Sequence, residues 1–367
     1  MSKKKEEELS SSSLTNVRNI RSIQIKYINY FLIVIIIFIL AFVVFYIGSF
    51  DIEYEKIPIC GDGTFYNTCS LAKPYFCDDG ILIEKASICG CNKNLEFSKE
   101  NESCVSEYNI NSRNITLGYF LLGQQNEIIF TAFEGVYNNI SNMSRVIYYE
   151  GSEMPSRVDF KLQSISNEFQ KEMILPLVKK IQNSAPYDKA EQVRIAIGLV
   201  QTIPYGFLEK TDKFGNISIN HSRYPYEVLY ENQGICGEKS LLLAFLLKEM
   251  GYGVSIFYFA DENHEAVGIK CPIEKSFYGS GYCFVETGGA SIITDFSMEF
   301  ANGKKLNSMP DILLISDGIP LPDDMYEYKD AKTLNDIRNR NLLGFLKSWK
   351  FDKIKEKYGL VEAYELE

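Results

Sequence analysis

The sequence predicts an α+β protein that follows an N-terminal apolar segment and a small cysteine-rich module. Three observations predict this fold class. Residues 110–149 alternate apolar and polar side chains in short runs, as antiparallel strands do. Residues 169–203 instead place apolar side chains at helical spacing. Residues 236–287 predict an apolar helix followed by three strands.

The composition is that of a globular protein and argues against two kinds of function. At roughly 150 residues per domain, 367 residues suggest two or three folded units. The net charge of −10 provides no basic face for nucleic acid, so no nucleic-acid partner is expected. The chain has only two histidines, His221 and His264, which excludes a histidine-rich metal site. We therefore expect neither a metal nor another cofactor.

Residues 31–47 form an unbroken apolar run of 17 residues. With its apolar flanks, the segment 28–50 reaches the roughly 20 residues that span a bilayer as a helix. A cleaved signal peptide is the competing interpretation, but its apolar part is only about 7–15 residues long. We favour an uncleaved signal anchor, with the lipid bilayer as its partner. Basic residues precede the run and acidic residues follow it, which predicts a cytosolic N-terminus, a disordered tail over 1–27 and an extracellular remainder.

Glycosylation sequons support the extracellular assignment. All six N-x-Ser/Thr sequons follow the predicted span, which is the pattern of a cell-surface glycoprotein. They begin at Asn101, Asn114, Asn139, Asn142, Asn216 and Asn220.

Six cysteines within residues 58–106 predict a disulfide-rich module. So short a segment cannot bury enough apolar surface to fold without covalent links. Zinc is a poor alternative, because the segment has no histidine and no paired C-x2-C knuckles. The module resembles a small cysteine-rich module of archaeal surface proteins, which often has two further cysteines, absent here near Ala86 and Phe97. Sequence cannot choose among the 15 possible pairings of Cys60, Cys69, Cys77, Cys89, Cys91 and Cys104.

The middle and the end of the chain are predicted from periodicity. The β-rich segment 108–155 should hold strands over 114–123, 127–137 and 145–151. Helices should follow over 169–185, with Pro176 inside, and over 188–203, with a cap at Tyr187 or Asp188. Residues 306–330, which contain three prolines, predict a loop. One amphipathic helix over 331–358 should then pack on the domain.

The residues that predict chemistry begin at Cys236. This cysteine lies between Gly234 and Gly237 at the start of an apolar helix that should end near Met250, before Gly251. A helix N-terminus stabilises the thiolate, which is the nucleophilic form of cysteine.

Two further reactive groups follow on consecutive strands. His264 should open the second predicted strand, and Glu286 should lie on the third. Thiolate, imidazole and carboxylate would then form a nucleophile, its base and a group that orients the base. Asp295 is the second candidate for the acid.

The remaining cysteines favour this assignment. Cys271 and Cys283 flank the hairpin loop and should pair, which leaves Cys236 as the odd thiol. Strand alternation puts both partners on the face opposite His264 and Glu286. If His264 lay directly across from Glu286, however, the two cysteines would be offset by about four residues, too far for a disulfide. A bulge or a diagonal His–Glu contact must absorb this offset.

Residues 156–305 resemble the transglutaminase-like superfamily, in particular its archaeal membrane-anchored members. The matching segments are LVQTIPY, YPYEVLY, QGICGEKSLLLAFLLKEMGYGV, NHEAVGIKCP and YCFVETGG. The resemblance implies a papain-like α+β fold with Cys236 as nucleophile, His264 as base and Glu286 as orienting acid. Familiar members have aspartate where this chain has Glu286. The resemblance also implies that Tyr205 lines the site.

Two functions remain open from the sequence. The first is a cysteine acyl-transfer enzyme that hydrolyses or transamidates a protein or peptide substrate at the cell surface. Its oxyanion donors would be the Cys236 backbone N–H and a side chain, for which Gln233 and Gln201 are candidates. The alternative is a catalytically inactive surface adaptor that retains the fold.

Overall fold

The computed structural model describes residues 33–43, 58–206, 210–214, 217–296, 305–339 and 344–360. The chain divides into two units, Met1–Ile57 and Pro58–Glu367. In the first unit, residues 33–43 are helical. None of the helices in the described ranges is long and apolar enough to cross a membrane. The predicted tail over 1–27 and most of the predicted span over 28–50 lie outside these ranges.

The second unit is built around a four-stranded antiparallel sheet, which confirms the α+β class. Its strands are β9 (Val254–Phe259), β10 (His264–Lys270), β11 (Tyr282–Val285) and β12 (Asp311–Ser316), in the order β11-β10-β9-β12. The first three are the predicted strands. The fourth corrects the predicted loop over 306–330. Its prolines flank the strand rather than interrupt it, and β12 pairs only with β9 as an edge strand.

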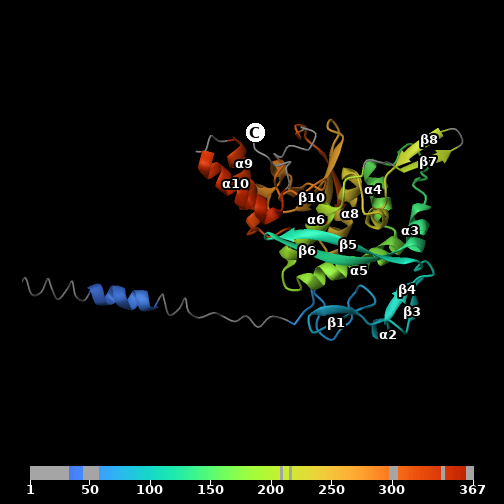
Figure 1. Ribbon diagram of the computed structural model, residues 1–367, viewed down its shortest axis with the longest axis horizontal. Coiled ribbons are helices and arrows are strands. Elements are labelled where there is room, and N and C mark those ends of the chain that lie inside the picture. The colour runs from blue at the N-terminus through green and yellow to red at the C-terminus, as the bar shows by residue number, and fades with distance from the viewer. Residues whose placement is uncertain are drawn as a thin grey trace, which may run out of the picture. The chain divides into compact units, whose positions relative to one another are not determined.

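Helix α8 (Cys236–Glu249) lies at the centre of this unit (Figure 1). It contacts β9 and β10 of the sheet and the helices α6 (Lys189–Thr202) and α7 (Pro225–Glu231). Every residue from 238 to 247 is buried. A helix that is apolar on all sides must be enclosed, and this enclosure fixes where Cys236 emerges.

The predicted helices over 169–185 and 188–203 are confirmed as α5 (Glu168–Ser184) and α6. Asp188 caps α6 by accepting a hydrogen bond from the Glu191 N–H. Both helices contact the long hairpin of β5 (Ser112–Leu121) and β6 (Gln124–Phe133), drawn beside α5 in Figure 1. The hairpin turns at Leu122 and Gly123, which both have positive φ.

The predicted strand over 145–151 is wrong, because these residues form no regular structure. Helix α3 (Glu134–Ser141) follows the hairpin instead. The Arg145 guanidinium then bonds to the carbonyl oxygens of Ser141 and Met143 and to Glu227, which holds this segment to α7 rather than to a strand. Helix α4 (Arg157–Ile165) begins after it with a Ser156 cap.

The single helix predicted over 331–358 is divided. Helices α9 (Tyr326–Asn339) and α10 (Gly344–Tyr358) replace it. Their apolar residues Leu334, Ile337 and Ile354 are buried in a cluster with Ile292, so this part packs on the domain as expected. The second unit also contains a short hairpin, β7 (Lys210–Phe214) and β8 (Ile217–His221).

Three disulfides hold the cysteine-rich module, as predicted, and the structure selects one pairing. The bonds are Cys60–Cys77, Cys69–Cys89 and Cys91–Cys104. The module has two short hairpins and one helical turn and little core of its own. These elements are β1 (Tyr75–Asp78), β2 (Ile81–Glu84), α2 (Ala86–Cys89), β3 (Glu96–Ser98) and β4 (Ser103–Val105).

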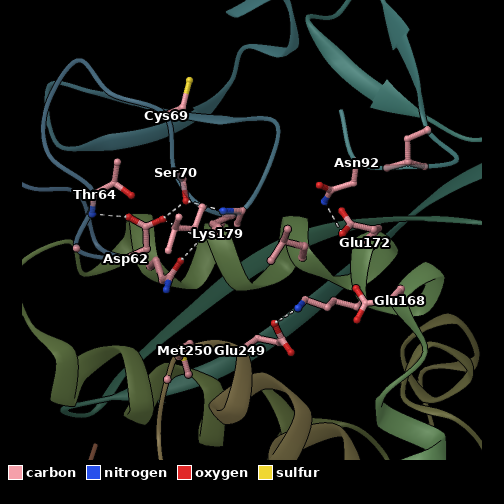
Figure 2. A pocket seen from close by; sticks show the side chains of 18 of the residues that line it. Asp62, Thr64, Cys69, Ser70, Asn92, Glu168, Glu172, Lys179, Glu249 and Met250 are labelled. Atoms are coloured by element: carbon pink, nitrogen blue, oxygen red, sulfur yellow. Dashed lines mark hydrogen bonds and ion pairs between the residues drawn. The ribbon is translucent and has the colours of Figure 1, made fainter. Parts of the chain in front are cut away.

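Polar contacts attach the module to α5 across a cavity of about 1090 Å³ (Figure 2). The Lys179 ammonium lies 3.0 Å from the Asp62 carboxylate, and both side chains are more than nine-tenths buried. At the other end, Asn92 donates to Glu172 at 2.6 Å. Burial lowers the pKa of Lys179 even though Asp62 opposes this, so the ion pair offsets only part of the cost of burial.

We predict that Lys179→Met lowers the free energy of unfolding by about 3 kcal/mol, because it leaves Asp62 buried without its cation. Burial raises the pKa of Asp62, but Lys179, Ser70 and Thr64 outweigh this and lower it to about 2. The stability that Asp62 provides is therefore present above pH 3.8 and lost as the pH falls through about 2. Urea unfolding at pH 7 and pH 2 measures both effects. A difference between variant and wild type that stays constant down to pH 2 would contradict the prediction.

Candidate active site

Cys236 is the first residue of α8 and the free cysteine of the chain. The Ile235 N–H just before it donates to the Glu238 carboxylate at 3.0 Å, which caps the helix start. Gly237 is required for space, because a β-carbon there would lie 2.8 Å from Oε2 of Glu265. That carboxylate is held 2.5 Å from the Lys161 ammonium. The thiol therefore sits at a capped, closely packed helix N-terminus.

The predicted thiol, imidazole and carboxylate meet in the structure. His264 is the first residue of β10, and its Nε2 lies 2.8 Å from Oε2 of Glu286. The Cys236 thiol hydrogen-bonds to the same ring, and with Nε2 engaged by the carboxylate this leaves Nδ1 for the sulfur. Oε1 of Glu286 accepts from the N–H groups of Thr287 (3.0 Å) and Gly288 (2.7 Å). Both carboxylate oxygens are thus fixed, and glutamate can orient the ring despite its extra methylene.

The β10–β11 register resolves the expected conflict between the site and the disulfide. Val267 pairs with Val285, and Ile269 pairs with Cys283. Glu286 is therefore offset by two residues from the position directly opposite His264. Cys271 is offset by two residues from the position directly opposite Cys283. The expected offset of four residues is thus divided equally between the His–Glu pair and the cysteine pair. The Cys271–Cys283 disulfide forms at a Cα separation of 5.8 Å. No bulge between β10 and β11 is needed.

Electrostatics favour the charged forms of the pair. Burial lowers the pKa of His264, but hydrogen bonds to Cys236 and Glu286 outweigh burial and raise it from 6.5 to about 10. Burial raises the pKa of Cys236, but the hydrogen bond and charge of His264 outweigh it, and the pKa is lowered overall. The arrangement supports a thiolate–imidazolium pair at neutral pH.

Of the three residues predicted to line the site, one lies beside Cys236 and two are bonded to other groups. The Tyr205 hydroxyl contacts the Cys236 thiol and accepts from the Cys236 backbone N–H, so Tyr205 lies at the site. The Gln201 amide instead donates to the Glu286 carbonyl oxygen at 2.8 Å and to Ser291. The Gln233 amide faces Glu231 at 3.4 Å. Both amides are directed to protein groups other than Cys236.

Asp295, the second candidate for the acid, and His221, the other histidine, have different partners. Asp295 forms a two-point ion pair with Arg338 of α9, at 2.6 and 3.0 Å, so it is not the partner of His264. His221 ends β8, where its ring faces the carbonyl oxygen of Ser222.

Three residues near the site were not predicted from the sequence. The Thr287 hydroxyl donates to the Cys236 carbonyl oxygen at 3.3 Å and lies 2.8 Å from the Ser240 hydroxyl. Ser240 in turn bonds to the Glu265 carbonyl oxygen at 3.1 Å. Lys239 is the third and is fully buried. The helical spacing of 239 and 240 from Cys236 was the available signal, but it does not reveal which face of the helix meets the turn after β11. In the described ranges, no cluster of three or more His, Cys, Asp or Glu is placed to hold a metal ion.

Comparison with known proteins gives no match: no protein-family model, no curated protein and no solved structure matches this chain.

We predict that His264 stays protonated through neutral pH and loses its proton near pH 10. Cys236→Ala and Glu286→Gln should each lower this pKa, because each removes a hydrogen-bonded anion from the ring. NMR titration of ¹³C-histidine-labelled protein measures it, and a second histidine, His221, serves as the internal control. A His264 resonance that titrates near 6.5 in wild type would contradict the prediction.

Proposed function

We propose that this protein is a membrane-anchored, extracellular cysteine hydrolase or acyltransferase of the transglutaminase-like type, with a papain-like active site. One observation carries the proposal. A thiol at a helix N-terminus bonds to an imidazole, whose other nitrogen bonds to a buried carboxylate at 2.8 Å. This order of groups is what nucleophilic catalysis by cysteine needs. The likeness of the QGICGEKS, NHEAVGIK and CFVETGG segments to that superfamily adds the class.

The first half of the proposed reaction forms an acyl-enzyme. Sγ of Cys236 attacks the carbonyl carbon of a peptide bond or side-chain carboxamide, and the carbonyl electrons move to oxygen. As they return, the C–N bond breaks, and the His264 imidazolium gives its proton to the departing nitrogen. A thioester on Cys236 and a free amine or ammonia result, with His264 now neutral.

The second half releases the acyl group. Neutral His264 takes a proton from water, whose oxygen attacks the thioester carbon, and the C–S bond breaks to restore the thiolate. A primary amine in place of water would give transamidation. Hydrolysis is the default outcome, since water is always present.

The oxyanion is best served by the Cys236 backbone N–H and the Tyr205 hydroxyl. The hydroxyl already lies beside that N–H and beside the thiol. Gln201 and Gln233, the earlier candidates, direct their amides elsewhere. Backbone N–H and phenol are both suitable donors to a developing negative charge.

The extracellular location draws support from two features of the folded unit. Eight of the nine cysteines form disulfides, which persist in oxidising compartments. Among the sequons, Asn101, Asn114 and Asn142 are exposed and Asn139 is partly exposed, while the side chains of Asn216 and Asn220 lie outside the described part. A protein or peptide at the cell surface is the proposed substrate.

We predict that iodoacetamide alkylates Cys236 alone in the folded, non-reduced protein, because the other cysteines are paired. Alkylation should persist well below the roughly 8.5 pKa of a free thiol, since an adjacent imidazolium favours the thiolate. His264→Ala should move the midpoint upward by about one pH unit or more. Glu286→Gln should move it less. Alkylation rates across pH, followed by mass spectrometry, measure this.

The matched control is His221→Ala, which should leave the profile unchanged. If native Cys236 is unreactive, or titrates like a free thiol whether or not His264 is present, the enzyme proposal fails. The inactive surface adaptor would then be the better account.

We further predict that protease added outside intact cells removes the mass that follows residue 50, since the positive charge before the apolar run keeps the N-terminus inside. Immunoblots against N- and C-terminal tags measure this. A mature N-terminus mapped near Asp51 would instead indicate a cleaved signal peptide and a secreted protein.

A further inference from the structure

Lys239 is a fully buried lysine one helical turn after Cys236. Its ammonium donates to three backbone carbonyl oxygens, those of Ile203 at 2.7 Å, Gln201 at 3.2 Å and Gly288 at 3.3 Å. An ammonium has three donors, so its hydrogen-bonding capacity is filled. Lysine is almost never fully buried unless it is paired.

The three carbonyl groups belong to two different walls of the site. Gln201 and Ile203 lie at the end of α6, in the corner that leads to Tyr205. Gly288 belongs to the turn after β11, whose N–H groups hold the Glu286 carboxylate. Lys239 thus joins the helix of the nucleophile to the segment that carries Tyr205 and to the segment that carries Glu286.

The charges around the site show a second role for the ammonium. Cys236 as a partly buried thiolate and Glu286 as a fully buried carboxylate are two anions, and His264 as imidazolium balances one of them. Lys239 supplies the second cation. Other charged groups at this end of α8 are already paired: Glu265 with Lys161 at 2.5 Å, and Arg223 with Glu238 at 3.2 Å. Burial of an uncompensated charge is costly, so the thiolate form depends on both cations.

We propose that Lys239 is a positioning residue of this active site, which fixes the Tyr205 and Glu286 segments against α8 and provides the cation that keeps Cys236 ionised. The proposal rests on the proposed function. In support, burial lowers the pKa of Lys239 to about 8, against the opposing charges of Glu286 and Cys236. An ammonium that the two anions help keep charged must favour those anions in return.

The test is Lys239→Met, which keeps the length of the side chain and removes the charge, compared with Lys239→Arg, which keeps a charge. The matched control is Lys179→Met, because Lys179 is an equally buried lysine that bonds to Asp62, away from the site. We expect Lys239→Met to move the alkylation midpoint of Cys236 upward, with about threefold less thiolate below the midpoint. Lys239→Arg should move it less. Lys179→Met should lower stability and leave the midpoint unchanged.

A folded Lys239→Met with the wild-type midpoint would overturn the proposal, as would an equal shift in Lys179→Met. If Lys239→Met does not fold, a titration of the wild-type protein tests the proposal instead. In ¹³C-lysine-labelled protein, one lysine should titrate near pH 8, and its pKa should fall after iodoacetamide neutralises Cys236. No such fall would overturn the proposal. Failure of the proposed function gives a different result. Wild-type Cys236 would then be unreactive at every pH below the pKa of a free thiol.

Discussion

The complete burial of α8 is the constraint on which the rest of the domain depends. A helix with ten consecutive buried residues needs cover on every side, and the sheet, α6 and α7 provide it. Such a helix can present functional groups only at its ends. Its N-terminus, with unpaired N–H groups and the positive end of the dipole, is the end that stabilises an anion. The burial of α8 in the core therefore places Cys236 at an end of the helix that favours a thiolate.

Around that helix end, the structure pairs buried carboxylates with cations. Glu227 is met by Arg145 and Lys210, Glu238 by Arg223, and Glu265 by Lys161. Removal of one partner from such a pair costs more than the pair contributes, so these contacts fix geometry more than they add stability. Glu286 fits this pattern through His264 and two backbone N–H groups. The rigidity of the site thus comes from pairs that tolerate only one arrangement.

Periodicity predicted the elements of the central domain because each must bury one face or all faces. It identified α5, α6, α8 and three sheet strands, and the residue types at their ends indicated the thiol, imidazole and carboxylate. It missed β12, because this edge strand lies between prolines and is defined only by its pairing with β9, which the sequence pattern does not show. It misassigned 145–151, because side-chain contacts such as that of Arg145 with Glu227 hold this segment without strand pairing. It could not find Lys239, since a buried lysine on an apolar helix is recognised only when the carbonyl groups it meets are known.

The β10–β11 pair shows why the register could be bounded but not fixed from sequence. Alternation placed the cysteines and the site on opposite faces, which any even shift preserves. The choice among even shifts depends on two demands at opposite ends of the same strands, a disulfide near the hairpin loop and a His–Glu contact near the helix. Neither can be met by direct pairing without the loss of the other. The observed register gives each a diagonal of two residues. The disulfide therefore also restrains the site, because a shift of two residues in either direction would separate one of the pairs.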